Sequence, residues 1–347
     1  MNMVHGDHTL LHCRPLLRQM ISKLSNLSFS SLPLPPAQLT NLESLGYLEM
    51  TAIQAAALPQ ALAGVDLIGQ AKTGSGKTAA FTLPLLTRIN PRDFGTQALI
   101  LCPTRELASQ VASEIRRLAR YQQNIKVVTL VGGQSIGPQI GSLEHGAHVV
   151  VGTPGRIKDH LRKETLSLER VNTLVLDEAD RMLEMGFVDD IEAIIGETPA
   201  TRQTLLFSAT FPENILKLSA RFQTTPQRVS VESLHDGQHI DQQFFICQKS
   251  DRLAALVKLL AHFQPSAAVV FCNTKQLVRE VCEHLNRSGI HAQALHGDME
   301  QRDRDQVLNQ VKHLWCSKLV ATDLAARPLD IDDLPAVVNL ELPRKTE

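Results

Sequence analysis

Short apolar runs alternate with longer amphipathic stretches along most of the chain. The apolar runs lie at 66–68, 98–102, 127–131, 148–151, 174–176 and 204–207. The stretches between them, such as 106–121, repeat apolar residues at the spacing of one helix face. Strands that alternate with helices build a parallel sheet that helices cover on both sides. The pattern therefore predicts an α/β domain, with ligands at the carboxyl ends of its strands.

The alternation is interrupted once and then resumes. Residues 223–243 lose the periodicity and are rich in Gln, Thr, Pro, Ser, His, Asp and Gly, which predicts an interdomain linker. The renewed pattern predicts helices at 251–263 and 275–286 and strands at 267–271, 292–295, 318–321 and 336–340. We therefore expect a disordered leader at 1–28, a first domain at 29–222 and a second α/β domain at 244–347.

Composition and charge narrow the class of protein. The 347 residues, 43% of them apolar, are enough for two domains with separate cores. The 35 Lys and Arg against 36 Asp and Glu exclude a globally basic protein, so nucleic acid would have to bind a local patch. The six cysteines form no C-x-x-C pair, which indicates a reducing compartment and no structural metal. No apolar run approaches ~18 residues. We expect a cytoplasmic monomer that does not contact membranes.

A glycine-rich loop follows the first apolar run. It reads Ala71, Lys72, Thr73, Gly74, Ser75, Gly76, Lys77 and Thr78. The two glycines let the backbone turn tightly and point N–H groups at an anion, and the helix that follows adds its positive end. Lys77 would reach the β- and γ-phosphates of a nucleotide, and the Thr78 hydroxyl would bind Mg²⁺. The strict phosphate-loop pattern has glycine in place of Ala71, so an ordinary surface turn is the alternative.

A strand with an acidic end is the second candidate feature. The run at 174–176 is followed by Asp177 and Glu178. Asp177 would hold Mg²⁺ opposite the phosphate loop, and Glu178 would orient or deprotonate an attacking water. The alternative is an acidic helix N-terminus after a strand, which is common. Together the two features predict a nucleoside triphosphatase with Lys77, Asp177 and Glu178 as catalytic residues.

An aromatic residue and a side-chain amide precede the phosphate loop. Gln54 can pair with the donor and acceptor of an adenine base, and Tyr47 or Phe29 can contact its ring. The alternative is a tyrosine packed on the core and a solvated glutamine. With a phosphate loop close behind, the first interpretation predicts ATP as the nucleotide.

Short motifs follow the predicted strands in both halves of the chain. In order they are Gly46-Tyr47 with Gln54, the loop at 71–78, Pro103-Thr104-Arg105-Glu106-Leu107, Gly132-Gly133, Thr153-Pro154-Gly155-Arg156, Asp177-Glu178-Ala179-Asp180, Ser208-Ala209-Thr210, Val270-Phe271-Cys272-Asn273-Thr274, His296-Gly297-Asp298 and Ala321-Thr322-Asp323. This series resembles the DEAD-box ATP-dependent RNA helicases from about residue 29 to the last residue. The resemblance implies an α/β fold of two tandem RecA-like (P-loop) parallel-sheet domains, and alanine at position 71 is usual in that family.

The resemblance also implies a role for each motif. ATP and Mg²⁺ would be bound by Phe29, Tyr47, Thr51, Gln54, Ala71, Lys72, Thr73, Gly74, Ser75, Gly76, Lys77, Thr78, Asp177 and Asp330. RNA would be bound by Pro103, Thr104, Arg105, Glu106, Gly132, Gly133, Thr153, Pro154, Gly155, Arg156, Asn273, Thr274, Gly297, Asp298 and Thr322. The residues that would couple the state of ATP to the RNA surface are Asp180, Ser208, Ala209 and Thr210. Taken singly, such motifs are also compatible with plain turns and helix caps.

The chain departs from the family pattern in three places. Ala52 stands where the family usually has proline, which we expect to have a mild effect. Pro328 stands where the family has glycine, and because proline lacks an N–H and fixes φ, we expect a weaker ATP-bound state. The sequence ends at Glu347, before a His-Arg-Ile-Gly-Arg-like segment whose arginines can supply roughly 10³–10⁵ in rate. It also ends before the RNA-binding domain of the most similar members. The resemblance thus implies an incomplete second domain and a truncated, catalytically impaired chain.

Three functions stay open at this point. The first is an ATP-dependent RNA helicase that acts on ribosomal RNA in ribosome assembly. The second is a non-catalytic clamp or decoy that keeps ATP and RNA binding. The third is a DNA-directed P-loop motor, against which only the family resemblance argues.

Overall fold

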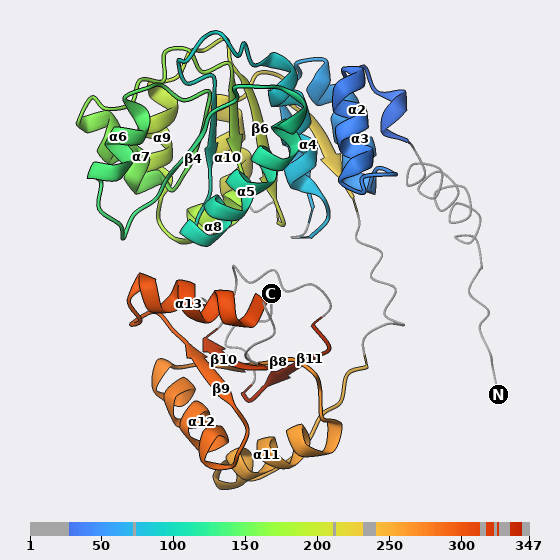
Figure 1. The fold of residues 1–347 in the computed structure, drawn as a ribbon, viewed down its shortest axis with the longest axis vertical. Helices are drawn as coiled ribbons and strands as arrows, with labels where there is room; N and C mark the ends of the chain where they lie inside the picture. Colours follow the sequence, from blue (N-terminus) through green and yellow to red (C-terminus); the bar gives the residue numbers. More distant parts are fainter. Residues whose placement is uncertain are drawn as a thin grey trace, which may run out of the picture. The chain divides into compact units, whose positions relative to one another are not determined.

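The computed structural model describes residues 28–71, 74–210, 213–231, 241–312, 317–322, 325 and 334–341. The chain divides into two compact units, Met1–Leu234 and His235–Glu347 (Figure 1). Each unit contains a parallel sheet covered by helices. The prediction of two α/β domains is therefore confirmed.

Seven parallel strands form the described sheet of the first unit, in the order β3-β4-β2-β5-β6-β1-β7. They are β1 (Leu67–Gln70), β2 (Ala98–Leu101), β3 (Val127–Leu130), β4 (Val149–Gly152), β5 (Thr173–Leu176), β6 (Gln203–Ser208) and β7 (Gln227–Ser230). The six apolar runs that predicted strands all lie in this sheet. Because every pair is parallel, the carboxyl ends of the strands share one edge.

Successive side chains of these strands point to opposite faces, and each face has its own core. Leu67 and Phe207 belong to the core under one face, whereas Ile68 and Leu206 belong to the core under the other. The central strands are buried on both faces. This double burial explains why the runs at 98–101, 174–176 and 205–207 are continuously apolar rather than alternating.

Helices cover both faces of the sheet. Helices α3, α4 and α5 contribute to the first core, and α7, α8, α9 and α10 contribute to the second. In Figure 1, α6, α7 and α9 gather on one side of the unit, with α2, α3 and α4 on the other. The helices are η1 (Phe29–Ser31), α2 (Pro36–Ser44), α3 (Ala52–Leu62), α4 (Lys77–Arg88), α5 (Arg105–Leu118), η2 (Ala119–Tyr121), α6 (Gly137–Leu143), α7 (Pro154–Arg162), α8 (Ala179–Glu184), α9 (Val188–Gly196) and α10 (Glu213–Phe222).

Two of the elements that the sequence pattern does not predict are β7 and α3. β7 lies inside 223–243, the range expected to be a linker, where it pairs with β1 as an edge strand. Most of its side chains are exposed, so no apolar run marks it. Helix α3 is also absent from the sequence expectations. Its residues are mostly alanine and leucine around Pro59, so it has no polar face to reveal a helical period.

Four parallel strands form the described sheet of the second unit, in the order β11-β8-β10-β9. They are β8 (Ala268–Cys272), β9 (Ala292–Leu295), β10 (Lys318–Thr322) and β11 (Ala336–Asn339). Helices α11 (Arg252–Phe263) and α12 (Lys275–Arg287), after η3 (Lys249–Asp251), pack on one face, and α13 (Gln301–Lys312) packs on the other (Figure 1). The predicted elements of this unit are confirmed, and α13 is additional.

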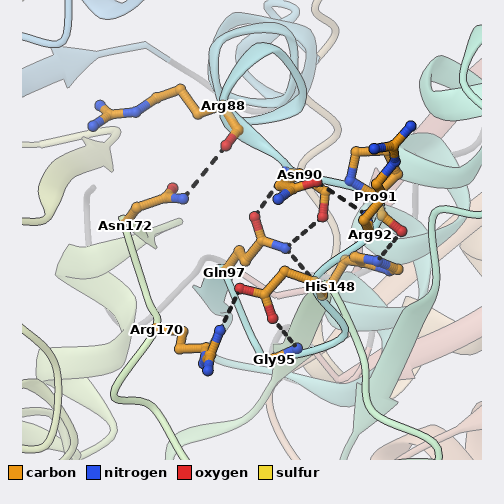
Figure 2. Close-up of polar contacts among 10 residues, drawn as sticks. Arg88, Asn90, Pro91, Arg92, Gly95, Gln97, His148, Arg170 and Asn172 are labelled. Atoms are coloured by element: carbon orange, nitrogen blue, oxygen red, sulfur yellow. Dashed lines mark hydrogen bonds and ion pairs between the residues drawn. The ribbon is translucent and has the colours of Figure 1, made fainter.

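A polar network lies at the amino ends of β2 and β4, away from the carboxyl edge (Figure 2). The ring of His148 is fully buried in it. Its Nδ1 accepts a hydrogen bond from the N–H of Lys126 at 3.0 Å, and its Nε2 lies 3.3 Å from the carbonyl of Pro91. These partners require a neutral ring with its proton on Nε2. Burial lowers the pKa of His148, against the attraction of the nearby Asp93 carboxylate.

The neutral ring makes folding stability depend on pH. The pKa of His148 is lower in the folded chain than in the unfolded chain, so its contribution is complete above the unfolded pKa and is lost as the pH falls below it. We expect the free energy of unfolding to fall more for the wild type than for H148Q between about pH 7 and about pH 5. Urea denaturation would measure this. His145 is exposed, so H145Q is the matched control and should follow the wild type. Parallel profiles for H148Q and the wild type would contradict the prediction.

Candidate functional site

Three loops meet at the carboxyl edge of the first sheet. β5, β6 and β1 are parallel neighbours, so the residues that follow them lie close together. The N–H of Ala71 donates to the carbonyl of Ser208 at 3.1 Å, which joins the loop after β1 to the end of β6. The end of β5 brings Asp177 to the same edge.

The phosphate loop has the backbone that its glycines predict. Gly74 and Gly76 have φ values of 79° and 90°, in the left-handed region that glycine adopts without strain. A Cβ at Gly76 would lie 2.5 Å from Nε2 of Gln54, so the loop also needs glycine there for space. Helix α4 begins directly afterwards at Lys77. The first N–H groups of the helix therefore lie beside the loop, where an anion would bind.

Lys77 and Asp177 form the centre of this edge. Nζ of Lys77 lies 3.9 Å from Oδ1 of Asp177, and the side chains are 6% and 3% exposed. Within the described part of the chain, neither of these two atoms has a hydrogen-bond partner. Buried charged groups without hydrogen bonds are costly. The pair is therefore suited to receive an anion at the lysine and a cation at the aspartate.

The environment of Asp177 fits a magnesium ion. Burial raises the pKa of Asp177 to about 6 against the attraction of Lys77, and the charges of Glu178 and Asp180 raise it further. Mg²⁺ is usually held by one or two carboxylates together with phosphate oxygens rather than by an all-protein cage. The described residues accordingly contain no group of three or more His, Cys, Asp or Glu that could hold a metal. Thr78, at the second position of α4, adds a hydroxyl.

Glu178 directly follows Asp177 with a φ of 53°. A non-glycine residue in this region is uncommon and is often found at functional sites. Its carboxylate forms an ion pair with Nη1 of Arg181 at 2.9 Å, one turn later in α8. The sequence analysis did not select Arg181, although the Glu-x-x-Arg spacing at a helix start is a signal for such a pair.

Gln54 contacts the phosphate loop from the first turn of α3. Its Oε1 accepts a hydrogen bond from the N–H of Thr51 at 2.8 Å, and its Nε2 donates to the carbonyl of Gly76 at 3.1 Å. Thr51 and Gln54 thereby form the capping box that starts the helix. The amide predicted to recognise adenine is thus also bonded to the loop predicted to hold the phosphates.

Tyr47 and Phe29 pack edge to face, with ring centroids 6.1 Å apart. The hydroxyl of Tyr47 donates to Oε1 of Glu114 on α5 at 2.6 Å, and burial raises the pKa of Tyr47. Phe29 is only 3% exposed and belongs to the core. Both rings therefore have a packing role, which for Tyr47 agrees with the alternative interpretation of a tyrosine packed on the core. A contact between either ring and adenine stays a prediction.

A hydrogen-bond network joins the ends of β5 and β6. The carboxylate Oδ2 of Asp180 accepts from both the N–H and the hydroxyl of Thr210, each at 2.9 Å. The hydroxyl of Ser208 accepts from the N–H of Asp180 and donates to the carbonyl of Thr210. Gln70, which the sequence analysis did not select, donates to the carbonyl of Ala209 at 3.3 Å. The four predicted coupling residues therefore lie together, next to Asp177.

The loops predicted to bind RNA contact one another at the end of the sheet where β3, β4 and β2 are neighbours. A Cβ at Gly133 would overlap the guanidinium of Arg105, and Nη2 of Arg156 donates to the carbonyl of Gln134 at 2.8 Å. Thr104 and Thr153 are the residues before α5 and α7. Pro103 and Gly132 lie in the loops themselves, whereas Glu106, Pro154 and Gly155 lie in the first turns of α5 and α7.

In the second unit the predicted RNA residues also follow strands. Asn273 and Thr274 follow β8, Gly297 and Asp298 follow β9, and Thr322 ends β10. The hydroxyl of Thr274 accepts from the N–H of Leu277 and so starts α12. The carboxylate of Asp298 forms ion pairs with Lys275 and Arg279 of that helix. Lys275 and Arg279 are further cations that the sequence analysis did not select.

Some predicted positions cannot be placed. Lys72, Thr73, Pro328 and Asp330 lie outside the described residues. No described helix has the length and apolarity to span a bilayer.

Comparisons with known proteins agree with this geometry. The DEAD/DEAH box helicase family profile matches residues 51–218, and the helicase conserved C-terminal domain matches residues 251–347. The ATP-dependent RNA helicase DbpA of Escherichia coli K12 is 57% identical over 91% of this chain and 69% of its own length. The DEAD-box ATP-dependent RNA helicase CshA of Bacillus cereus is 44% identical over 92% of this chain and 61% of its own length.

Two solved structures show the same fold. S. cerevisiae Dbp5 bound to RNA and ADP BeF3 superimposes with a TM-score of 0.82 at 29% identity, over 92% of this chain and 82% of Dbp5. A DEAD box protein from Methanococcus jannaschii is 38% identical, with a TM-score of 0.58 over 92% of this chain and 87% of that protein. Both halves of the chain are thus matched in sequence and in fold, and the chain belongs to the DEAD-box family of ATP-dependent RNA helicases.

Proposed function

We infer that this chain binds Mg²⁺-ATP at the carboxyl edge of the first sheet and couples its hydrolysis to the remodelling of RNA duplexes. The observation that carries the proposal is the buried pair of Lys77 and Asp177, whose facing atoms lack hydrogen bonds within the described residues. A triphosphate with its Mg²⁺ would satisfy both atoms at once. The relatives DbpA and CshA are named as ATP-dependent RNA helicases, which supports the same activity here.

Each side chain at this edge has a distinct task in the proposal. Lys77 and the N–H groups at the start of α4 bind phosphate oxygens and oppose their charge. Asp177 and Thr78 would hold Mg²⁺, which supplies charge neutralisation at the phosphates. Glu178, held by Arg181, accepts a proton from the attacking water or orients it. Gln54 senses the base and the loop together through its bond to Gly76.

RNA would lie across the loops that follow β2, β3 and β4. Arg105 and Arg156 supply positive charge there, and Thr104 and Thr153 supply hydroxyls. Such groups bind phosphates and 2′-OH groups and therefore recognise the shape of the strand. The network of Asp180, Ser208 and Thr210 would transmit the state of the nucleotide, since it starts two residues from Glu178.

Several finer points stay predictions. These are the domain boundaries, a ribosomal RNA substrate, a role in ribosome assembly, a monomeric state and the weaker ATP-bound state expected from Pro328. The chain spans 69% of the length of DbpA and 61% of that of CshA. The activity of the whole relatives is therefore proposed for this chain rather than assigned to it.

Substitutions at Lys77 and Glu178 test the proposal. We expect K77A to lose nucleotide binding, because the anion loses its main cation. E178Q should keep binding but lose about 100-fold or more in ATP turnover, because the proton acceptor is gone. Isothermal titration with ATP and Mg²⁺ and an RNA-stimulated ATPase assay would measure both effects.

The exposed Lys163 gives the control variant K163A, which should behave as the wild type. If the wild type binds no adenine nucleotide, the proposal is wrong. A wild type that binds RNA tightly with ATP but shows no turnover would instead favour the non-catalytic clamp. Turnover stimulated by DNA and not by RNA would favour a DNA-directed motor.

The titration of Asp177 gives a test of its buried environment without ligands. Its pKa of about 6 in the folded chain lies above the usual value of 3.8, so its contribution to stability is complete below the unfolded pKa and is lost as the pH rises through about 6. D177N carries no such charge. We expect the free energy of unfolding of D177N, relative to the wild type, to increase on the order of 3 kcal/mol as the pH rises over this range and then level off. Chemical denaturation in EDTA would measure it, and a constant difference across the range would contradict it.

A further inference from the structure

Gln203 is a buried amide at the amino end of β6, far along the strand from the nucleotide edge. It is the first residue of β6 and only 2% exposed. Its Nε2 donates to the carbonyl of Ala61 at 2.9 Å and to the carbonyl of Val65 at 2.8 Å. Its Oε1 accepts from Nη1 of Arg88 at 2.9 Å. Both donor hydrogens and the acceptor of this amide are therefore used.

The three partners belong to the elements that carry the nucleotide site. Ala61 lies at the end of α3, whose first turn carries Gln54. Val65 leads into β1, which runs to the phosphate loop. Arg88 is the last residue of α4, which starts at Lys77. One side chain thus joins the far ends of the three elements whose near ends hold the nucleotide-binding residues.

We propose that Gln203 is a positioning residue for the nucleotide site, acting through α3, β1 and α4. The assignment rests on the proposed function. The carbonyls at a helix end have no partner within the helix, so Gln203 satisfies Ala61 while it fixes the angle at which α3 leaves the sheet. The guanidinium of Arg88 also lies close to Gly64, because a Cβ at Gly64 would be 3.7 Å from Nη1 of Arg88.

A small displacement at Gln203 would matter at the other end. A helix of the length of α3 spans about 16 Å and moves as a rod, so a tilt at its end shifts its first turn. At that first turn, Nε2 of Gln54 lies 3.1 Å from the carbonyl of Gly76, with no room for a Cβ at Gly76. The spacing between Gln54 and Lys77 is therefore set by the spacing of α3 and α4.

Neither leucine nor glutamate can replace the amide. Leucine would leave the carbonyls of Ala61 and Val65 without donors in a buried site. Glutamate would keep an acceptor for Arg88 but would place negative charge against the same two carbonyls. Either change would disturb the contact between the three elements rather than the nucleotide itself, because none of the partners of Gln203 in these three hydrogen bonds belongs to the phosphate loop.

The chain contains a matched control in Gln97, which is 4% exposed (Figure 2). Its Nε2 donates to the carbonyls of Asn90 and Asp93 at 2.8 and 2.6 Å, and its Oε1 accepts from the N–H of Asn90 at 2.8 Å. Like the amide of Gln203, the amide of Gln97 donates two hydrogen bonds and accepts one. They all stay within the loop between α4 and β2, however, and join no two elements of the nucleotide site.

The test compares Q203L with Q97L in the full chain. Each variant loses one buried amide, so both should lower the melting temperature. We expect Q203L to raise the Kd for ATP with Mg²⁺ about tenfold and the KM of the RNA-stimulated ATPase with it, and Q97L to change both less than about twofold. The value of kcat should change less than KM in Q203L, because Lys77, Asp177 and Glu178 are intact.

A variant of the exposed Arg88 tests the same contact if Q203L does not fold. Arg88 is exposed, and R88M removes its bond to Gln203 without burying a new charge, so we expect a weaker rise in Kd of about threefold. Equal Kd values for Q203L and Q97L, or a wild-type Kd in R88M where Q203L cannot be purified, would overturn the positioning role alone. Loss of ATP binding already in the wild type would overturn the proposed function and the positioning role together.

Discussion

The first unit keeps two opposite charges buried at the carboxyl edge of its sheet. At 3.9 Å, Lys77 and Asp177 attract each other, but neither facing atom has a hydrogen-bond partner within the described residues. Such a pair does not stabilise a fold by itself, since desolvation can exceed the Coulombic gain. It persists because the surrounding elements fix its position: α4 begins at Lys77, and β5 delivers Asp177 to the same edge. A site that is costly when empty gains most when a phosphate and a cation enter it.

The rest of the first unit explains how that position is fixed. β6 lies between β1 and β5, and each of its ends contacts elements that carry the site. At its carboxyl end, Ser208 joins the Asp180 network, and at its amino end Gln203 joins α3, the approach to β1 and α4. β6 thus links the nucleotide site at the carboxyl ends of the strands with the packing at their amino ends. Rigidity at the amino ends is a condition for precise geometry at the carboxyl ends.

The sequence predicts the central strands and the motifs after them because double burial and glycine leave local signals. Gly74 and Gly76 are needed at positive φ, and the strand before Asp177 is wholly apolar, so both can be recognised from single segments. β7 and Gln203 leave no such signal. β7 is an exposed edge strand that pairs through its backbone, and Gln203 binds two carbonyls that are distant in sequence. A backbone carbonyl is the same in every residue type, so no pattern of side chains in the sequence can reveal which carbonyl a side chain binds.

The hydrogen bond between Tyr47 and Glu114 could not be predicted either, since it depends on the tertiary position of α5.

The second unit shows how a nearly neutral protein can present cations to RNA. The chain has a net charge of −1, so positive potential must be local. Asp298 was expected at the RNA surface by its motif, yet a carboxylate repels phosphate. Here it forms ion pairs with Lys275 and Arg279, and the hydrogen bond from Lys275 is the main cause that lowers the pKa of Asp298. The charged carboxylate therefore aligns two cations at the start of α12.

Arg279 has a second partner besides Asp298. Its Nε donates to Nε2 of His296 at 3.3 Å, which requires that Nε2 of His296 be unprotonated. In the proposed function, this motif would serve RNA through the helix it organises, and the cations that would contact the RNA strand belong to residues outside the motif.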